Sequence, residues 1–471
     1  MSDPRQQLIA AVRAELGDKA VVTDPADIEP WLTDWRGRWT GKSVAILQPA
    51  STGEVAAMVR LANRFNVPLV PQGGNTSMVG GATPSADGTQ LILSLRRMNR
   101  IRSIDPVAMR GVAEAGVVLQ TLHDMVAAEG LRFPLTLGAR GSATIGGLTS
   151  TNAGGTQVLR HGPMRALIEG VEAVLPDGTI HNGLSGLKKD NRGPSIDQML
   201  IGAEGTLGIV TAVRLKLEPA LKGRAVAWLG VASPQAALDT LRALERRTDR
   251  IEGFEILPDE SLQAAITQIE GTRSPLDGAH PWHVLVEAVT DDAGEEPADA
   301  LLERLLAPLI GGTVEDAVIA ASEAQAEAFW KIRDSMSEAE KKQFGPATQH
   351  DISVPVDLMP RFMIEAAAAV EAAFPGTRAS GFGHLGDGNV HFHVRAGTRG
   401  GADWAAAEGA AVTRLVDDLV TTVGGSISAE HGIGQMKRDE LQRLNPARVH
   451  TLRALKAALD PNDLMNPGKL V

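Results

Sequence analysis

Histidines are concentrated in one short stretch of the chain. Residues 383–394 read GHLGDGNVHFHV and hold three of the chain's eleven histidines. Alternation along NVHFHV predicts a strand whose apolar residues face one side while His391 and His393 face the other. The glycine-rich turn before this strand can bring His384 back towards His391. This spacing raises the question of what the histidines hold.

Two imidazoles supply two of the three protein ligands of a catalytic metal site. The segment SAEHGIG offers Glu430 as the third ligand, with His431 beside it. A His–His–Glu set with open positions suits a catalytic Zn²⁺ or Mn²⁺ ion. A solvated, histidine-rich hairpin is the alternative interpretation, and the spacing alone leaves both open.

The composition limits which residues can carry the chemistry. The 471-residue chain has no cysteine and no tyrosine, so proton transfer falls to His, Asp, Glu or Lys. Its net charge of -11 argues against a nucleic-acid partner or an anionic membrane. The N-terminus is charged and amphipathic, and no stretch approaches the ~20 apolar residues of a membrane span. These features predict a cytoplasmic protein.

Three glycine-rich segments can bind an anion. PQGGNTSMVGG, residues 71–81, can turn successive N–H groups towards one anion. A run of small residues follows at 138–162, and GAEGTLG lies at 202–208. One such loop is ordinary surface structure. Three of them, without a G-x-G-x-x-G pattern, indicate a dinucleotide site outside the Rossmann family.

Two differently built regions must position these segments. Before Pro219 the pattern predicts an αβ unit that ends in the first glycine loop, and a hairpin around Asp177-Gly178. After Pro219, predicted helices alternate with strands such as WHVLVEAV. We therefore expect a domain boundary near residue 220. The predicted helices lie near 234–247, 259–269, 296–309 and 324–343.

The last of these predicted helices carries a candidate anion-binding arginine. Arg333 and Ser337 are four residues apart, which predicts that they share a helix face. Arginine can hold a carboxylate through two parallel hydrogen bonds. A solvated charged face is the alternative interpretation.

Taken together, these motifs resemble the flavoproteins of the vanillyl-alcohol-oxidase type, and most closely the D-2-hydroxyglutarate and D-lactate dehydrogenases. PQGGNTSMVGG resembles the flavin pyrophosphate loop, and GSATIGGLTSTNAGG and GAEGTLGIVT resemble the other two flavin segments. GFGHLGDGNVH and AEHGIG resemble the metal and active-site motifs. The resemblance implies an α+β fold with a two-subdomain FAD-binding domain at 1–220, a cap domain with an antiparallel sheet at 221–425, and a C-terminal segment at 426–471 that returns to the flavin.

The resemblance also implies the cofactors. FAD would be held without a covalent bond, because Asn75 lies in the loop where covalent members of the family often have a histidine. Zinc or manganese would bind to His384, His391 and Glu430. The implied FAD-binding residues are Pro71, Gly73, Gly74, Asn75, Thr76, Ser77, Gly138, Ser142, Gly146, Thr149, Asn152, Gly155, Glu204, Gly205, Ile209 and Asn466.

The implied reaction is the oxidation of a D-2-hydroxy acid to its 2-oxo acid, with His431 as the catalytic base. D-2-hydroxyglutarate is the expected substrate, with D-malate next. A D-lactate or glycolate dehydrogenase is the alternative enzyme, and a non-catalytic flavin-binding subunit of an electron-transfer complex is the alternative of another class. Electrons would pass to an external acceptor, namely an electron-transfer flavoprotein, a cytochrome or a quinone. A homodimer is a further expectation.

Two positions depart from the hydroxyglutarate dehydrogenases. Gln349 stands where a lysine commonly precedes HDISVP, and His393 stands where an asparagine commonly follows the second metal histidine. Arg333 matches the family's substrate arginine, and Ser337 stands where threonine is common. One strong cation is thus kept and a second is lost, which leaves the identity of the acid open. The predicted substrate-binding residues are Arg333, Ser337, Gln349, His393 and His431.

Overall fold

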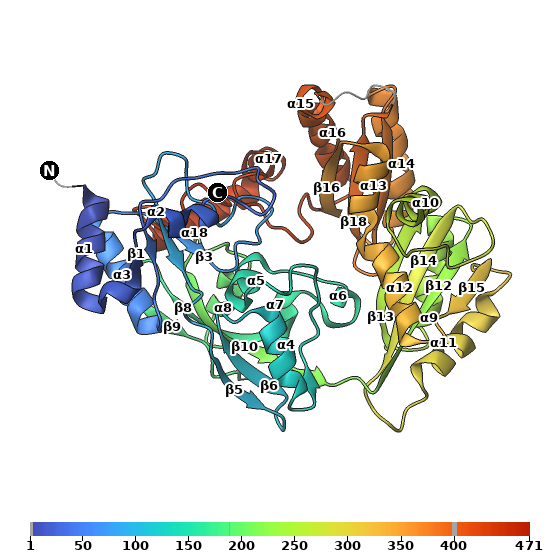
Figure 1. The fold of residues 1–471 in the computed structure, drawn as a ribbon, viewed down its shortest axis with the longest axis horizontal. Helices are drawn as coiled ribbons and strands as arrows, with labels where there is room; N and C mark the ends of the chain where they lie inside the picture. The colour runs from blue at the N-terminus through green and yellow to red at the C-terminus, as the bar shows by residue number, and fades with distance from the viewer. Residues whose placement is uncertain (1–2, 188, 398–402) are drawn as a thin grey trace. The chain divides into compact units, whose positions relative to one another are not determined.

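The computed structural model describes residues 3–187, 189–397 and 403–471. They form two compact units (Figure 1). Unit 1 comprises Met1–Gly155, Gly162–Ala220 and Glu430–Val471, and unit 2 comprises Thr156–His161 and Leu221–Ala429. Each unit is therefore assembled from segments that are separated in the sequence.

The first sheet of unit 1 has the strand order β1–β2–β4–β3. β2 (Ile46–Leu47), β4 (Leu91–Ser94) and β3 (Leu69–Gln72) run parallel, and β1 (Val21–Val22) pairs with β2 in antiparallel fashion. Parallel strands need a crossover connection, and α3 (Thr52–Phe65) supplies it between β2 and β3, which lie on either side of β4. β3 then runs directly into the first glycine-rich loop, so the predicted αβ unit is confirmed.

Helix α3 is well delimited by its own sequence. The Ser51 hydroxyl accepts a hydrogen bond from the Glu54 N–H at 3.2 Å, and Asn66 ends the helix in the left-handed conformation. The apolar face of α3 is buried together with that of α1 (Pro4–Leu16), the amphipathic helix predicted at the N-terminus. The central strands of this sheet lie in the same core.

The second sheet of unit 1 has five antiparallel strands. Its strands, in sheet order, are β5 (Ile101–Asp105), β6 (Arg110–Glu114), β10 (Ile209–Lys216), β8 (Ile168–Val174) and β9 (Ile180–Asn182). β8 and β9 pair around Gly178, whose φ of +83° suits the glycine of the predicted hairpin. The helices that accompany this sheet are α4 (Leu119–Ala127), α5 (Ile145–Thr151), α7 (Met164–Leu167) and α8 (Ile196–Leu200).

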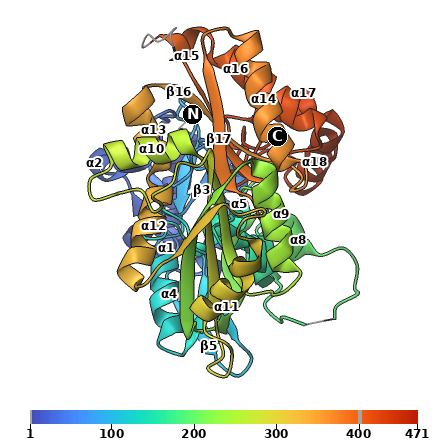
Figure 2. The same cartoon turned by 90° about the vertical axis from the view of Figure 1, so that its right-hand side faces the viewer.

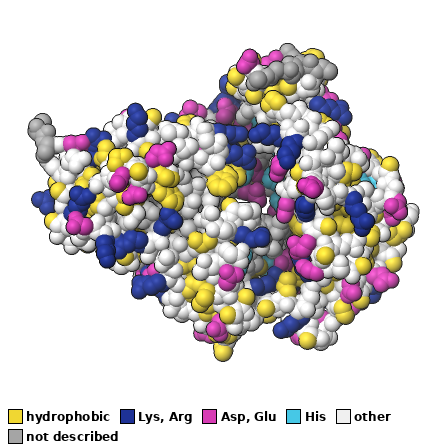
Figure 3. All heavy atoms as spheres, viewed as in Figure 1, with side chains coloured by type: hydrophobic (Ala, Val, Ile, Leu, Met, Phe, Trp, Pro, Cys, Tyr) yellow, Lys and Arg dark blue, Asp and Glu magenta, His cyan; other side chains and the backbone are white. Residues whose placement is uncertain are grey.

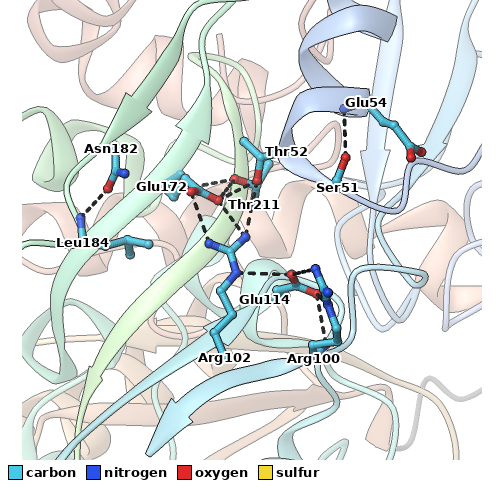
Figure 4. A network of polar contacts seen from close by, with 10 residues as sticks. All are labelled: Ser51, Thr52, Glu54, Arg100, Arg102, Glu114, Glu172, Asn182, Leu184 and Thr211. Carbon is cyan, nitrogen blue, oxygen red and sulfur yellow. Dashed lines mark hydrogen bonds and ion pairs between the residues drawn. The ribbon is translucent and has the colours of Figure 1, made fainter. Parts of the chain in front are cut away.

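A buried charge network joins strands of the five-stranded sheet to one another and to the start of α3 (Figure 4). Arg102 on β5 pairs with Glu114 at 3.2 Å and with Glu172 at 2.9 Å. The hydroxyls of Thr52 and Thr211 donate to Glu172 at 2.6 and 3.0 Å. Burial alone would raise the pKa of both carboxyls, but the arginine hydrogen bonds outweigh it and lower both pKa values.

Unit 2 is built on one seven-stranded antiparallel sheet. Its strands, in sheet order, are β15 (Asp316–Ile319), β12 (Gly223–Val231), β14 (Trp282–Thr290), β13 (Ile251–Pro258), β17 (Arg378–His384), β18 (Asn389–Arg395) and β16 (Ala347–Ser353). Side chains alternate between two apolar cores, one on each face of the sheet.

Helices cover both faces of the unit 2 sheet (Figure 2). The core on one face includes residues of α9 (Pro234–Glu245), α11 (Ala298–Leu306), α14 (Met359–Ala373), α15 (Trp404–Ala407) and α16 (Gly409–Thr422). The core on the other face, called face A below, includes residues of α10 (Asp259–Gln268), α12 (Glu323–Asp334) and α13 (Met336–Phe344).

The predicted single helix near 324–343 is wrong, because the chain breaks into α12 and α13 at Ser335. Arg333 is buried in the last turn of α12, whereas Ser337 is exposed in the first turn of α13. The prediction that these two residues share a face is therefore wrong as well.

The other short elements connect these layers. They are η1 (Asp18–Ala20), α2 (Pro25–Ile28), η2 (Glu29–Trp31), β7 (Leu131–Arg132), α6 (Val158–His161), β11 (Glu218–Pro219), η3 (Ala307–Leu309), α17 (Arg438–Leu444) and α18 (Pro446–Leu459). On the side of unit 1 seen in Figure 3, basic, acidic and apolar side chains are interspersed. Within the described part of the chain, no helix has the length and apolar character needed to span a membrane.

We expect Arg102→Met to destabilise the protein by about 3 kcal/mol at pH 7, because it leaves two buried carboxylates short of a partner. Both pKa values lie below the usual 4.5, so the network stabilises the fold above that pH and the contribution is lost as the pH falls. The variant should therefore unfold at a higher pH during acid titration. Urea and acid unfolding curves would measure both effects.

The matched control is Arg100→Met. Arg100 also pairs with Glu114, at 2.9 Å, but its side chain is 71% exposed. Arg100 is largely solvated and contacts one carboxylate, Glu114, which keeps Arg102 as a partner in this variant, so Arg100→Met should lose clearly less stability than Arg102→Met. Equal losses in the two variants would contradict the assignment of the network's stability to Arg102.

Candidate active site

The first glycine-rich loop of unit 1 lies directly against the second. A Cβ atom on Gly74 would come within 1.8 Å of the Ser142 carbonyl oxygen, and one on Gly73 within 2.2 Å of the Thr144 hydroxyl. Glycine is therefore the residue that fits at both positions. Asn75 takes a left-handed φ of 53°, and its amide donates to the Thr33 carbonyl at 2.9 Å.

The third glycine-rich segment joins the same cluster through two buried side chains. Glu204 accepts the Ile433 N–H at 2.7 Å and the Gly434 N–H at 2.8 Å. The amide of Asn466 donates to the Gly81 and Glu204 carbonyls at 2.9 and 2.7 Å. Burial raises the pKa of Glu204, and the two backbone N–H groups partly offset that effect. Glu204 and Asn466 thus connect the first loop, the third segment and the C-terminal segment.

This cluster fits a large polar cofactor. Among the described residues, the Thr144 hydroxyl and the carbonyl oxygens of the Asn466 and Gln72 side chains are buried without a hydrogen-bond partner. Buried polar atoms normally have partners, so unpaired ones beside glycines without room for a Cβ point to a ligand. A dinucleotide supplies both donors and acceptors for such atoms.

Several predicted cofactor residues also make contacts within the protein. The Thr149 hydroxyl donates to the Ile145 carbonyl at 2.7 Å inside α5, and Asn152 accepts the Arg165 N–H at 2.8 Å. Ile209 is buried in the apolar core. Gly146 and Gly155 lie against Ala115 and the Thr136 carbonyl respectively.

The remaining predicted positions lie along the glycine-rich segments themselves. Pro71 lies 3.0 Å from the position of a Cβ on Gly205, so the first and third segments also touch. Thr76 and Ser77 are half-buried, Ser142 is exposed, and no atom lies within 4 Å of a Cβ on Gly138 among the described residues.

In unit 2, the predicted alternation of the histidine strand is confirmed. β17 and β18 form an antiparallel hairpin in which Phe382 lies opposite His391 and Ser380 lies opposite His393. The apolar residues of β18 enter the core on one face, and the histidines lie on face A. The ring centroids of His384 and His391 are 5.5 Å apart, and each ring offers a nitrogen within 4.8 Å of the other's.

The end of the unit 2 segment that precedes the third predicted ligand lies near this pair. Ala429, the last residue of unit 2, donates its N–H to the Asp351 carbonyl at 3.4 Å. Asp351 lies opposite His391 in the β16–β18 register. Glu430 follows Ala429 directly, so its Cα is ~3.8 Å further along the chain. His431 follows in turn, and both residues are counted with unit 1.

His391 has the character of a neutral ligand. Its burial lowers its pKa well below the usual 6.5, and the nearby charges of Arg333 and His384 act in the same direction. A neutral imidazole keeps a lone pair for a cation. The His384 and His391 pair therefore fits a divalent metal, and it fits a soft-to-borderline ion such as zinc better than an all-oxygen site would.

Glu255 on β13 connects the histidine pair with Arg333. One carboxylate oxygen lies 2.6 Å from His384 Nδ1, and the other accepts the Arg333 Nε–H at 2.7 Å. Burial alone would raise the pKa of Glu255, but His384 and Arg333 outweigh it and lower the pKa to about 2. The residue is thus a carboxylate, with both oxygens engaged.

Arg333 presents unused hydrogen-bonding capacity. Its guanidinium is buried and lies 5.2 Å from the centre of the Phe382 ring. Its Nη2 has no hydrogen-bond partner among the residues that the structure describes. A buried guanidinium nitrogen without a partner is costly, so this atom points to an anionic ligand.

The two positions that depart from the family lie opposite each other. Gln349 on β16 pairs with His393 on β18 in the strand register. His393 Nδ1 lies 2.6 Å from the buried Glu340 carboxylate, which also accepts the Ser261 hydroxyl at 2.5 Å. Burial would raise the pKa of Glu340, but His393 and Ser261 outweigh it and lower the pKa.

Sequence reasoning missed Glu255, Glu340 and Thr144. Glu255 lies in IEGFEILP, where two buried glutamates, Glu252 and Glu255, interrupt a strand whose other side chains are apolar. That interruption is a detectable signal, because a charge in a buried strand needs a partner. Glu340 lies in a charged helix and Thr144 among small residues, so neither carries such a signal.

Comparison with known proteins places this geometry in a family. Residues 221–470 match the family described as FAD linked oxidases, C-terminal domain, and residues 44–183 match the one described as FAD binding domain. The chain belongs to the FAD-linked oxidases. The predicted family is confirmed, and the predicted cofactor FAD is the one named in both family descriptions.

Named relatives cover the chain almost completely. The D-2-hydroxyglutarate dehydrogenase of Xanthomonas citri pv. viticola is 36% identical over 100% of this chain and 97% of its own length. The mitochondrial D-2-hydroxyglutarate dehydrogenase of Bos taurus is 36% identical over 96% and 81%. A putative mitochondrial D-lactate dehydrogenase of Schizosaccharomyces pombe is 33% identical over 95% and 86%. The cytoplasmic location of this chain stays a prediction.

Solved structures share the fold at low sequence identity. Substrate-bound p-cresol methylhydroxylase aligns with a TM-score of 0.73 at 16% identity, over 100% of this chain and 97% of its own. An alkyldihydroxyacetonephosphate synthase aligns with a TM-score of 0.74 at 16% identity, over 98% and 84%. The predicted α+β, vanillyl-alcohol-oxidase-type fold is confirmed.

Glu204→Ala should destabilise unit 1 by about 2–4 kcal/mol, because it leaves two backbone N–H groups without an acceptor. It should also reduce the FAD content of the purified protein, since the three glycine-rich segments lose their connection. Glu204→Gln keeps one acceptor oxygen and should show about half of the effect. Thermal unfolding and flavin absorbance would measure both, and an alanine variant equal to the unmodified protein would contradict the assignment.

Proposed function

We propose that this FAD-linked oxidase oxidises a D-2-hydroxy acid with a second, distal carboxylate to its 2-oxo acid. D-2-hydroxyglutarate is the best candidate and D-malate the next. The observation that carries this proposal is the buried Arg333 guanidinium, whose Nη2 lacks a partner among the described residues. The Glu255 carboxylate contacts both this guanidinium and His384 of the histidine pair.

FAD, when bound, supplies the hydride acceptor. The glycine-rich segments of unit 1 would hold it through backbone N–H groups and through Thr144 and Asn466. Asn75 has no nucleophilic side chain, which supports attachment without a covalent bond. The two electrons would leave to an external acceptor such as an electron-transfer flavoprotein, a cytochrome or a quinone. A homodimer stays a prediction.

A divalent cation, when bound, makes a nearby hydroxyl more acidic. His384, His391 and Glu430 are the proposed ligands, and zinc or manganese is the proposed ion. The neutral state of His391 and the Glu255 contact of His384 support this assignment. The two histidines would also orient the substrate's hydroxyl and 1-carboxylate.

His431 is the proposed general base. A neutral imidazole can accept a proton from a hydroxyl at neutral pH. His431 directly follows Glu430, so the proposed base and one proposed metal ligand are consecutive residues. Removal of a general base typically costs ~10²–10⁴-fold in rate.

Arg333 would bind the distal carboxylate, and His393 would lie beside it in place of the family's asparagine. The buried Glu340 carboxylate contacts His393 Nδ1, and Gln349 lies opposite His393 in the strand register. Without a lysine at position 349, the site is expected to accept several chain lengths. That expectation, together with the relative named as a D-lactate dehydrogenase, supports D-lactate or glycolate as the alternative substrate. A non-catalytic flavin subunit is the alternative of another class.

Replacement of His384 or His391 by alanine should abolish bound metal and turnover while FAD is retained. Loss of a ligand should cost more than the ~10–100-fold in affinity that loss of an outer partner typically costs. Metal analysis and flavin absorbance would measure both quantities. The exposed His450 provides the control, since His450→Ala should change neither. Equal metal content in all variants would refute the ligand assignment.

Arg333→Ala should raise KM for D-2-hydroxyglutarate by about 10–100-fold, because a charge-assisted hydrogen bond contributes about 1.5–3 kcal/mol. KM for D-lactate should change much less, since D-lactate has no distal carboxylate. Anaerobic bleaching of the flavin by a panel of D- and L-hydroxy acids would measure the difference. Arg361→Ala on the exposed face of α14 is the control, and Gln349→Lys should sharpen the preference for the dicarboxylate.

Equal losses on both substrates in Arg333→Ala would mean that the arginine holds the 1-carboxylate instead. A flavin that no hydroxy acid reduces would favour the non-catalytic flavin subunit.

A further inference from the structure

Glu255 occupies the central position between two groups that bind different parts of the proposed substrate. It lies opposite His384 in the β13–β17 register, and its side chain is 1% exposed. One oxygen contacts His384 Nδ1 at 2.6 Å, and the other accepts the Arg333 Nε–H at 2.7 Å. Each carboxylate oxygen of Glu255 therefore contacts a different side chain.

We infer that Glu255 is a positioning residue that sets the tautomer of His384 and the direction of Arg333, and thereby fixes the spacing between the cation site and the distal-carboxylate site. This inference rests on the proposed function. It assigns no contact between Glu255 and the substrate, so Glu255 acts through its two neighbours.

The contact with His384 determines which ring nitrogen is available to a cation. An ionised carboxylate can only accept hydrogen bonds, so the hydrogen between the two groups belongs to His384 Nδ1. The neutral ring then carries its lone pair on Nε2. The Arg333 guanidinium on the other oxygen of Glu255, at 2.7 Å, agrees with an ionised carboxylate. Metal-binding histidines commonly have a carboxylate partner of this kind, which fixes both the tautomer and the ring orientation.

The contact with Arg333 determines where the rest of the guanidinium points. The group is planar, so a hydrogen bond at Nε together with the packing on Phe382 fixes the direction of both Nη atoms. Nη2 is left buried without a partner among the described residues. Its donors are therefore directed at a fixed point by contacts that the substrate does not make.

The Glu255 carboxylate bridges the His384 ring and the Arg333 guanidinium, so neither of these two groups can move independently of the other. The path from the His384 ring to the Arg333 guanidinium consists of two hydrogen bonds and one carboxylate group. A bridge of this length holds the two binding groups at a constant separation. Substrate length would then be read against that separation, in addition to the charge of the distal group.

Simple neutralisation of a buried arginine is the alternative role for Glu255. That role requires a carboxylate near Arg333, but it requires no contact with His384. Glu340 provides an internal comparison, because it holds His393 Nδ1 at the same 2.6 Å without an arginine hydrogen bond and without a proposed metal ligand as its partner. The two glutamates therefore make a matched pair for mutation.

The test is the Zn²⁺ affinity of the metal-free, FAD-bound protein, measured by competition with a fluorescent chelator. Glu255→Gln presents one acceptor and one donor to the N–H groups of His384 and Arg333, so one of these two side chains must lose its partner. We expect Zn²⁺ affinity to fall by ~10–100-fold and KM for D-2-hydroxyglutarate to rise more than KM for D-lactate. Glu255→Asp keeps both acceptors on a shorter side chain, so its Zn²⁺ affinity should lie between those of the unmodified protein and Glu255→Gln. Glu340→Gln should keep the Zn²⁺ affinity of the unmodified protein.

Four outcomes would overturn the inference or the proposal beneath it. Unchanged Zn²⁺ affinity in Glu255→Gln would overturn the role of Glu255 while the proposed function stands. An equal loss in Glu340→Gln would reduce both glutamates to general supports of unit 2. Loss of Zn²⁺ affinity with equal changes in KM on both substrates would overturn the coupling to Arg333. Failure of the unmodified protein to bind Zn²⁺ would overturn the metal part of the proposed function.

A measurement on the unmodified, metal-free protein decides the tautomer without any variant. In ¹⁵N-labelled histidine spectra, the His384 ring should carry its hydrogen on Nδ1, with the resonance assigned by its loss in His384→Ala. A hydrogen on Nε2 would overturn the inference even if Glu255→Gln fails to fold.

Discussion

A carboxylate can be buried in a protein only where cations or N–H groups take up its charge, and this constraint arranges both units of the molecule. Glu172 and Glu114 connect strands of the five-stranded sheet of unit 1 because Arg102 contacts both. Glu204 holds the C-terminal segment because two of that segment's N–H groups are its partners. In unit 2 the same requirement brings a histidine and an arginine to Glu255. The functional groups are therefore positioned by the need to satisfy buried acids.

Local patterns in the sequence were sufficient to predict many elements. The hairpin at Gly178 is confirmed because the turn needs a residue that tolerates positive φ. The alternation of His391 and His393 is confirmed because one face of their strand enters an apolar core. The break at Ser335 was not predictable from periodicity, since the residues on both sides have helical patterns. What decides the break is which side chains are buried, and that depends on tertiary packing.

The predicted site was recovered less evenly. The glycines of the first loop were predicted for their flexibility, and the structure adds that their missing Cβ atoms allow the loops to touch. Thr149 and Asn152 stay predicted as cofactor contacts, and the structure adds that their side chains also bond backbone groups of the protein. A motif identifies the segment that a ligand needs, and it does not separate the residues that touch the ligand from those that shape the segment. Glu255 lies in no motif at all, because its role arises from register between strands far apart in the chain.

The order in which the chain enters the two units has a consequence for biosynthesis. The edge of the parallel sheet in unit 1 is completed by the far end of the chain, where Leu69 donates to the Leu464 carbonyl and accepts the Asn466 N–H, each at 2.8 Å. Contacts between residues so distant in sequence form slowly, because a long loop must close first. When the first 220 residues have emerged from the ribosome, the edge strand β3 therefore still lacks its partner. Unit 2 is synthesised during this delay, and the exposed edge is a template for aggregation until residues 464–466 arrive.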